Sequence, residues 1–202
     1  MIEPITLLAF LPAALALNLT PGADMMFCLG QGLRAGPRAA WAASAGIALG
    51  AFIHAGIAGL GLAALLAAAP WAFEVIRWAG VGYLLWLAVQ ALRSDTVSQG
   101  ATIPVIRAFR SALVVNLTNP KVALFVLAFV PQFIDPNAGS VLAQFLAFGA
   151  VLSAGGFVIN GLVGVFAGSV GARLRRGSRV LSYLTAGIFS ALALRLAILD
   201  RV

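Results

Sequence analysis

The chain has 202 residues, of which 62% are hydrophobic and only 9% are charged, and its mean hydropathy is +1.04. Soluble domains carry about 25% charged residues, so this composition excludes an ordinary soluble protein and indicates a membrane protein. The formal net charge of +7 comes from arginines in short connections between apolar runs, which is typical of membrane loops and not of a nucleic-acid surface. The single cysteine, Cys28, excludes a disulfide framework and a paired-cysteine redox site.

Six apolar runs are long enough to cross a bilayer, which takes about 20 helical residues. They cover residues 5–28, 41–68, 71–92, 111–133, 141–169 and 180–199. The sequence therefore predicts an all-α membrane protein that forms one domain over residues 1–202, with six transmembrane helices.

Two similar motifs interrupt the first and fourth runs. They read Asn18-Leu19-Thr20-Pro21-Gly22, followed by Asp24, and Asn116-Leu117-Thr118-Asn119-Pro120-Lys121. Proline removes a helical hydrogen bond, and in hydrocarbon this is tolerated only where protein or a wet cavity satisfies the freed groups. We therefore expect helices one and four to be broken at Pro21 and Pro120. A pair of broken helices at matching places in two halves points to the binding site of a transporter.

Arginine placement predicts the orientation in the membrane. With six spans, nine of the arginines fall on one side, and basic loops stay in the cytoplasm. Both termini are then periplasmic. Three spans per half place the halves, residues 1–95 and 106–202, in opposite orientations as inverted repeats, joined by a cytoplasmic linker over residues 93–110.

The two motifs supply the candidate substrate-binding residues. These are Asn18, Thr20, Pro21, Gly22, Asp24, Asn116, Asn119, Pro120 and Lys121. Carbonyls freed near Pro21, together with Asp24, would attract an ammonium group. Amides at the restarted fourth helix, together with Lys121, would attract a carboxylate.

Each charged or polar group inside the runs also has a plainer interpretation. Asp24 is a candidate proton carrier, or it forms a structural ion pair with Lys121. Lys121 binds an anion, or it extends to the cytoplasmic surface. His54 is a further coupling candidate, because a histidine titrates near neutral pH, and Asn160 is another. Alternatively, each of the two hydrogen-bonds to a neighbouring helix.

Several segments together resemble the LysE/RhtB superfamily of amino-acid efflux proteins. They are Thr20-Pro21-Gly22, the Gly46-xxx-Gly50-xxx-His54 spacing, Trp78-Ala79-Gly80, and Asn116 to Lys121 leading into Pro131-Gln132-Phe133. The resemblance implies a bacterial inner-membrane exporter of amino acids or their derivatives, driven by the proton gradient. Two positions depart from the pattern of this superfamily, because Ala23 follows Pro21-Gly22 and Asn160 stands where an acidic residue is common.

The function expected from the sequence is therefore an alternating-access exporter. Its partners are an amino acid or derivative, protons and the lipid bilayer, and a homo-oligomer is left open. The sequence has no nucleotide-binding loop, metal-ligand cluster or nucleophile–base pair, so we expect no cofactor, no nucleic acid and no enzyme activity. The rival hypotheses are a structural or assembly subunit and a membrane-embedded enzyme without transport activity.

Overall fold

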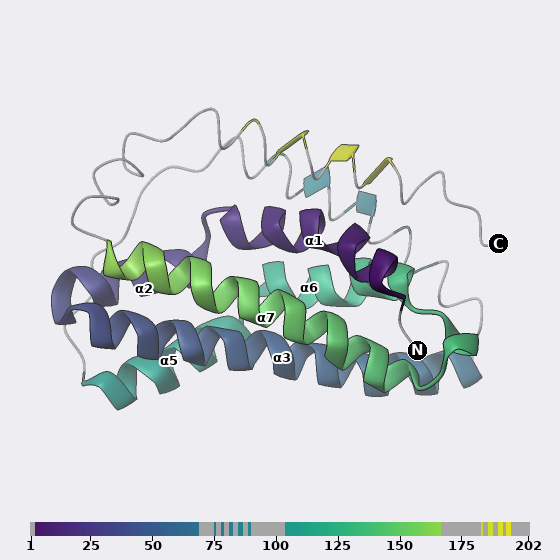
Figure 1. Ribbon diagram of the computed structural model, residues 1–202, viewed down its shortest axis with the longest axis horizontal. Coiled ribbons are helices and arrows are strands. Elements are labelled where there is room, and N and C mark those ends of the chain that lie inside the picture. The colour runs from purple at the N-terminus through teal and green to yellow at the C-terminus, as the bar shows by residue number, and fades with distance from the viewer. Residues whose placement is uncertain are drawn as a thin grey trace.

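The computed structural model describes residues 3–68 and 104–166, together with scattered positions between 75 and 89 and between 183 and 194. Regular structure in this part of the chain is entirely helical (Figure 1). The helices are α1 Pro4–Leu19, α2 Ala23–Ala35, α3 Pro37–Ala68, α5 Val105–Leu117, α6 Pro120–Phe129 and α7 Val141–Val165, with short 3-10 helices at Val130–Phe133 and Pro136–Ala138. The prediction of an all-α membrane protein is confirmed.

Two helices, α3 and α7, are each long and apolar enough to cross a membrane. The number in the described part rises to four if the bent pairs α1–α2 and α5–α6 each count as one span. These four overlap the predicted runs 5–28, 41–68, 111–133 and 141–169. The boundaries differ in that α2 continues to Ala35, α3 begins at Pro37 and α5 begins at Val105. The predicted third and sixth spans, 71–92 and 180–199, lie outside the described residues apart from scattered positions.

The chain leaves helical geometry between α1 and α2. A residue before proline is pushed out of the helical region by the proline ring, and Thr20, which precedes Pro21, is extended with φ −69° and ψ 118°. Gly22 is also extended, and α2 begins at Ala23. The two helices are bent by 55° relative to each other.

A second bend, of 53°, separates α5 from α6. Asn119, which precedes Pro120, is extended with φ −80° and ψ 106°. Its side chain then caps the new helix, because Asn119 Oδ1 accepts a hydrogen bond from the Lys121 amide at 3.0 Å. Pro120 occupies the first turn of α6, where its missing N–H costs nothing.

The long helices α3 and α7 run side by side through the middle of the molecule, with α5 along α3 and α1 over α7 (Figure 1). A tight turn at Gly36 lets α3 fold back beside α2. Gly36 has φ +79°, a conformation that residues with a Cβ rarely adopt.

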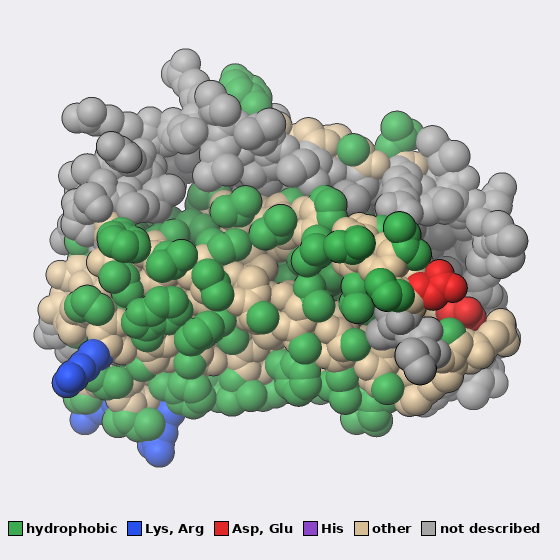
Figure 2. All heavy atoms as spheres, in the orientation of Figure 1, with side chains coloured by type: hydrophobic (Ala, Val, Ile, Leu, Met, Phe, Trp, Pro, Cys, Tyr) green, Lys and Arg blue, Asp and Glu red, His purple; other side chains and the backbone are tan. Residues whose placement is uncertain are grey.

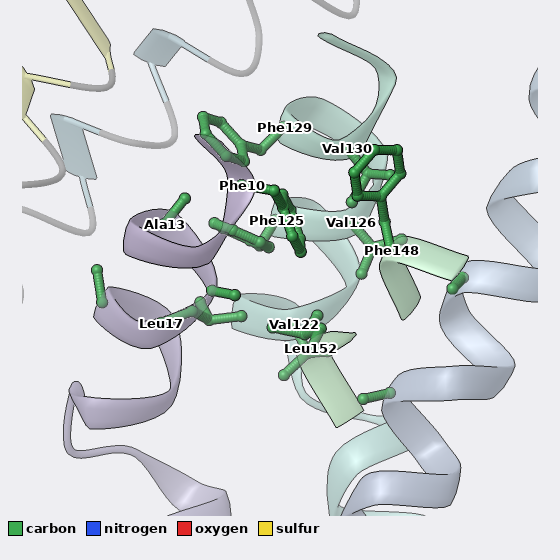
Figure 3. Packing of buried hydrophobic residues seen from close by; sticks show 14 of the residues in the cluster. Phe10, Ala13, Leu17, Val122, Phe125, Val126, Phe129, Val130, Phe148 and Leu152 are labelled. Carbon is green, nitrogen blue, oxygen red and sulfur yellow. The ribbon is translucent and has the colours of Figure 1, made fainter. Parts of the chain in front are cut away.

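Phenylalanine rings form the centre of the core between α1, α6 and α7 (Figure 3). Phe10 lies 5.0 Å from Phe148 and 6.3 Å from Phe129 by ring centroids, and all three are at most 1% exposed. Offset and edge-to-face ring pairs of this kind add to the packing energy. This cluster joins α1, α6 and α7.

The outer surface matches a lipid environment. Large apolar side chains cover the flanks of the helices, and charges gather at the ends (Figure 2). Figure 2 shows basic side chains at one end and acidic ones at the other. Arg34 and Arg38 flank the turn between α2 and α3, and Arg107 and Arg110 lie near the start of α5, whereas Glu3 precedes α1 and Asp135 lies between the two 3-10 helices. Ile57 and Leu60 on α3 are each 62% exposed, which is favourable in hydrocarbon and unfavourable in water.

Glycines permit a close crossing of α2 and α7. A Cβ added at Gly32 would collide with the main-chain carbonyl of Gly164, whereas a Cβ at Gly30 would meet nothing within 4 Å. We therefore expect Gly32→Ala to destabilise the protein by about 1–3 kcal/mol. The control Gly30→Ala should be neutral or stabilising by up to about 1 kcal/mol. Thermal unfolding in detergent measures both, and equal effects would mean that the crossing is looser than described.

Candidate functional site

Pro21 leaves one carbonyl of α1 without its helical donor. In a continuous helix the amide of residue 21 would donate to the carbonyl of Leu17, but proline has no N–H. Lys121 Nζ takes this place and donates to Leu17 O at 2.8 Å and to Thr20 O at 2.7 Å. The ammonium group therefore caps the carboxyl end of α1, where the helix dipole is negative.

Pro120 has the same effect on α5. The carbonyl four residues earlier belongs to Asn116, and His54 Nε2 from α3 lies 3.2 Å from it. Because a carbonyl oxygen only accepts hydrogen bonds, the His54 Nε2 must carry the hydrogen. At each bend, then, the carbonyl four residues before proline receives a basic side chain from a distant part of the chain. Asn116 O also accepts the Asn119 amide at 2.9 Å.

Asp24 lies in the first turn of α2 and joins this network through Asn116. Asn116 Nδ2 donates to Asp24 Oδ2 at 2.9 Å, and Asn116 itself is fully buried. Lys121 and Asn119 line the same cavity as Asp24. A carboxylate inside an apolar bundle is tolerated when it has such partners.

Glycines on the two long helices make room for the asparagines of the bends. Asn18 Nδ2 donates to Leu152 O on α7 at 3.1 Å, and a Cβ at Gly156 would lie only 3.1 Å from Asn18 Oδ1. Asn116 is seated in the same way on α3, where a Cβ at Gly50 would lie 2.5 Å from Asn116 Oδ1. Each bend thus packs against a long helix that belongs to the other half of the sequence.

Two small adjacent cavities lie among these groups. The break cavity is lined by Asn18, Thr20, Gly22, Asp24, Asn119, Lys121 and Asn160 among others, and the inner cavity by Asn18, Asp24, Asn116, Ser153, Gly156 and Asn160 among others. Each has room of about 20 Å³ for the centre of a water molecule. That is enough for a single water and too little for an amino acid.

Several buried oxygens on these cavities have no hydrogen-bond partner among the described residues. They are Asp24 Oδ1, Asn116 Oδ1, Ser153 Oγ and Asn160 Oδ1. Buried polar atoms are almost always paired, so each such atom calls for an explanation. Here the explanation is the cavities, because a water or another polar group placed in them could donate to these oxygens.

The structure therefore brings most of the candidate residues together. Asn18, Thr20, Gly22, Asp24, Asn116, Asn119, Lys121 and Asn160 line one or both cavities. Pro21 and Pro120 act instead through the carbonyls that they free. His54 lies outside the cavity linings and contacts Asn116 O, as the helix-linking interpretation expects.

Lys121 does not extend to the cytoplasmic surface, so that interpretation is wrong. Its aliphatic stem runs past Gly22, and its Nζ contacts the main chain of the first bend. The amide of Lys121 is also engaged, because the Asn119 side chain caps it. We expected the amides at the start of α6 to be available to a substrate anion. For the Lys121 amide this expectation is wrong.

Sequence reasoning did not identify Ser153 or the carbonyl of Leu17. A signal for Ser153 was present, since Ser153, Gly156 and Asn160 follow the spacing of one helix face. The Leu17 carbonyl follows from counting four residues back from Pro21. The sequence could not indicate which side chain would donate a hydrogen bond to that carbonyl.

The chain resembles known efflux proteins. It is 38% identical over 145 residues to the homoserine/homoserine lactone efflux protein of Salmonella typhimurium, which covers 70% of each chain. It is 30% identical over 188 residues to the leucine efflux protein of Enterobacter sp. (strain 638), covering 91% of this chain and 89% of that one. No solved structure matches it.

The family model of the LysE type translocator matches residues 15–200, which includes both bends and all the cavity-lining residues. Translocators of this kind are transporters and not enzymes, in agreement with the absence of a catalytic motif in the sequence. The chain belongs to the LysE type translocator family.

Proposed function

We propose that this protein exports amino acids or their derivatives across the bacterial inner membrane by alternating access. The observation that carries the proposal is the convergence of both bends on two small cavities that share Asp24 and Asn160. Discontinuous helices with exposed carbonyls and helix ends are the usual means by which transporters bind charged substrates. The efflux proteins named above are the relatives whose substrates suggest the class.

The substrate is a zwitterion bound between the two bends. Its ammonium lies on Leu17 O and Thr20 O near Asp24, because these oxygens already bind an ammonium group in Lys121. Its carboxylate lies toward the start of α6 and Lys121, since helix N-termini and lysine both favour anions. Each cavity has room for one water, so loading requires the halves to move apart on one side.

Each bent pair is one broken span, and the halves are inverted repeats. Three matched features support this. The bends of 55° and 53° follow similar motifs. Asn18 packs on α7 and Asn116 on α3, so the contacts are reciprocal. His54 follows Gly50 by four residues, as Asn160 follows Gly156.

Asp24 is the proposed proton carrier. It is the carboxylate that both cavities share, and its Oδ1 has no partner among the described residues. A proton bound there would remove the negative charge that holds the substrate ammonium. His54 and Asn160 remain secondary coupling candidates. His54 contacts Asn116 O, and the Asn116 side chain donates to Asp24.

Counterflow in proteoliposomes tests the function. Vesicles loaded with an unlabelled amino acid should accumulate the same labelled amino acid transiently, and the panel should include leucine and homoserine. An imposed pH gradient should then drive net movement of the accepted substrate. Absence of counterflow across the whole panel, with folded protein in the vesicles, would contradict an amino-acid exporter.

The orientation predicted from the arginines can be tested with single cysteines. Asn137 and Arg107 are both exposed and lie near opposite ends of the described helices. In a Cys28→Ser background, we expect Asn137→Cys to react with an impermeant thiol reagent in intact spheroplasts and Arg107→Cys to react only after lysis. This follows because basic segments stay in the cytoplasm. The reverse pattern would invert the topology, with the termini in the cytoplasm.

A further inference from the structure

Lys121 is the only lysine in the chain, and its ammonium lies at the centre of the proposed site. It donates to two main-chain carbonyls, Leu17 O and Thr20 O, at the end of α1. A Cβ added at Gly22 would lie 3.6 Å from both Lys121 Cδ and Nζ, so this glycine borders the path of the side chain. The amine therefore reaches across from α6 to the first bend.

The ammonium of an amino acid has the same chemistry as that of lysine. Both are primary ammonium groups with three donors and no acceptor. Two such cations cannot share one pair of carbonyls, because they would repel at short distance and compete for the same lone pairs. A substrate ammonium that binds these oxygens must therefore displace Lys121.

We propose that Lys121 holds the place of the substrate's ammonium and that loading exchanges the two. This inference rests on the proposed function and specifies its substrate class, an α-amino acid with a free ammonium and a free carboxylate. The substrate ammonium takes Leu17 O and Thr20 O, and the released Lys121 ammonium pairs with the substrate carboxylate. No covalent bond is made or broken, and the zwitterion adds no net charge to the site.

The exchange explains why both ends of the substrate matter. An amine without a carboxylate would displace Lys121 but leave its charge buried without a partner, which is unfavourable. A carboxylic acid without an amine would leave the two carbonyls to Lys121 and gain little. The site therefore selects the zwitterion, because binding of the ammonium is favourable only when the carboxylate is present to pair with Lys121.

The first experiment removes the internal ammonium and supplies a free one. In Lys121→Ala, methylammonium has both the space and the carbonyls, so it should raise the midpoint of thermal unfolding by about 3–6 °C at ten times its dissociation constant. Tetramethylammonium, which has no N–H donor, should give no such shift. Lys121→Met fills the space without donors, so methylammonium should not stabilise it. The wild-type protein should respond to neither ion.

Equal responses of wild type and Lys121→Ala to methylammonium would overturn the proposal, as would no response in a folded Lys121→Ala protein. If that variant does not fold, the wild type decides. Lysine labelled with ¹³C at Cε gives a single lysine signal, because the chain has one lysine. An amino acid accepted in counterflow should shift this signal, and methylammonium at the same concentration should not. An accepted substrate that leaves the signal unmoved would overturn the exchange.

The two proposals fail separately. Methylammonium binding to Lys121→Ala without any amino-acid counterflow would keep the ammonium site and reject the exporter. Counterflow without methylammonium binding or a Lys121 signal shift would keep the exporter and reject the exchange.

Discussion

Replacing Asp24 by asparagine is expected to abolish net export driven by a pH gradient while leaving folded protein in the membrane. The amide is nearly the same size, and its oxygen can still accept the hydrogen bond from Asn116 Nδ2, which is 2.9 Å long in the native protein. It has no proton to exchange in this pH range and no negative charge. Losing one partner of a buried charged pair costs about 2–5 kcal/mol, so affinity for the ammonium should fall at least about 30-fold.

Proteoliposomes with an imposed pH gradient measure net movement, and counterflow at equal pH measures exchange. Asp135→Asn is the matched control, because Asp135 is an exposed carboxylate at the far end of the described helices whose Oδ1 accepts from the Asn137 amide, a role an amide oxygen can also fill. It should export normally. Normal gradient-driven export by Asp24→Asn would exclude Asp24 as the coupling group and make His54→Asn the next variant to examine.

Replacing Pro21 by alanine is expected to preserve or raise stability and to weaken substrate binding. The new amide at position 21 can donate to Leu17 O, the carbonyl that Lys121 Nζ now occupies at 2.8 Å. Replacing proline by alanine inside a helix is worth about 3 kcal/mol, which offsets the lost lysine contacts. The carbonyl is then unavailable to an ammonium, so affinity should drop about tenfold or more, given a charged hydrogen bond of about 1.5–3 kcal/mol.

Pro120→Ala is expected to act on the other end of the substrate. Its new amide can donate to Asn116 O in competition with His54, and it lets α5 continue toward α6. Counterflow of the parent amino acid should weaken in both Pro21→Ala and Pro120→Ala. In the Lys121→Ala background, Pro21→Ala should also remove the stabilisation by methylammonium, whereas Pro120→Ala should leave it, because only the carboxylate is assigned to the start of α6.

A proline in the same chain provides the control. Pro12 lies inside α1, away from the cavities, and is exposed. Pro12→Ala gains an amide in a helix interior in the same way, so it should stabilise the protein without changing affinity. If Pro21→Ala behaves like Pro12→Ala, with unchanged affinity in counterflow, the first bend is a packing feature and the site must be sought along Ser153, Gly156 and Asn160.

The membrane class, the helical fold and the positions of the bends follow from local properties of the sequence. Hydrophobic runs of about 20 residues have one stable solution in a bilayer, because every backbone group must be paired within the segment. Proline acts on its own helix, so its position alone predicts where Thr20 and Asn119 leave helical geometry. Helix starts are less certain, as α5 illustrates by beginning at Val105 within a polar stretch that hydropathy assigns to a linker.

The identity of the site residues was also partly contained in the sequence, since a polar group inside an apolar run must find a partner. That requirement predicts that Asp24, Asn116 and Lys121 lie inward. It does not predict which partner each one finds, because partners are separated by about a hundred positions in the chain and meet only through helix packing.

Only the tertiary structure decided that Lys121 binds the carbonyls of the first bend and that His54 binds the carbonyl of the second. Both contacts depend on how far the glycines of α3 and α7 let the bent helices approach. Such distances are set by the whole packed bundle and not by any one segment. The sequence determined that each proline would remove the helical donor of one carbonyl, and the packing of the helices determined which basic side chain reaches each of those carbonyls.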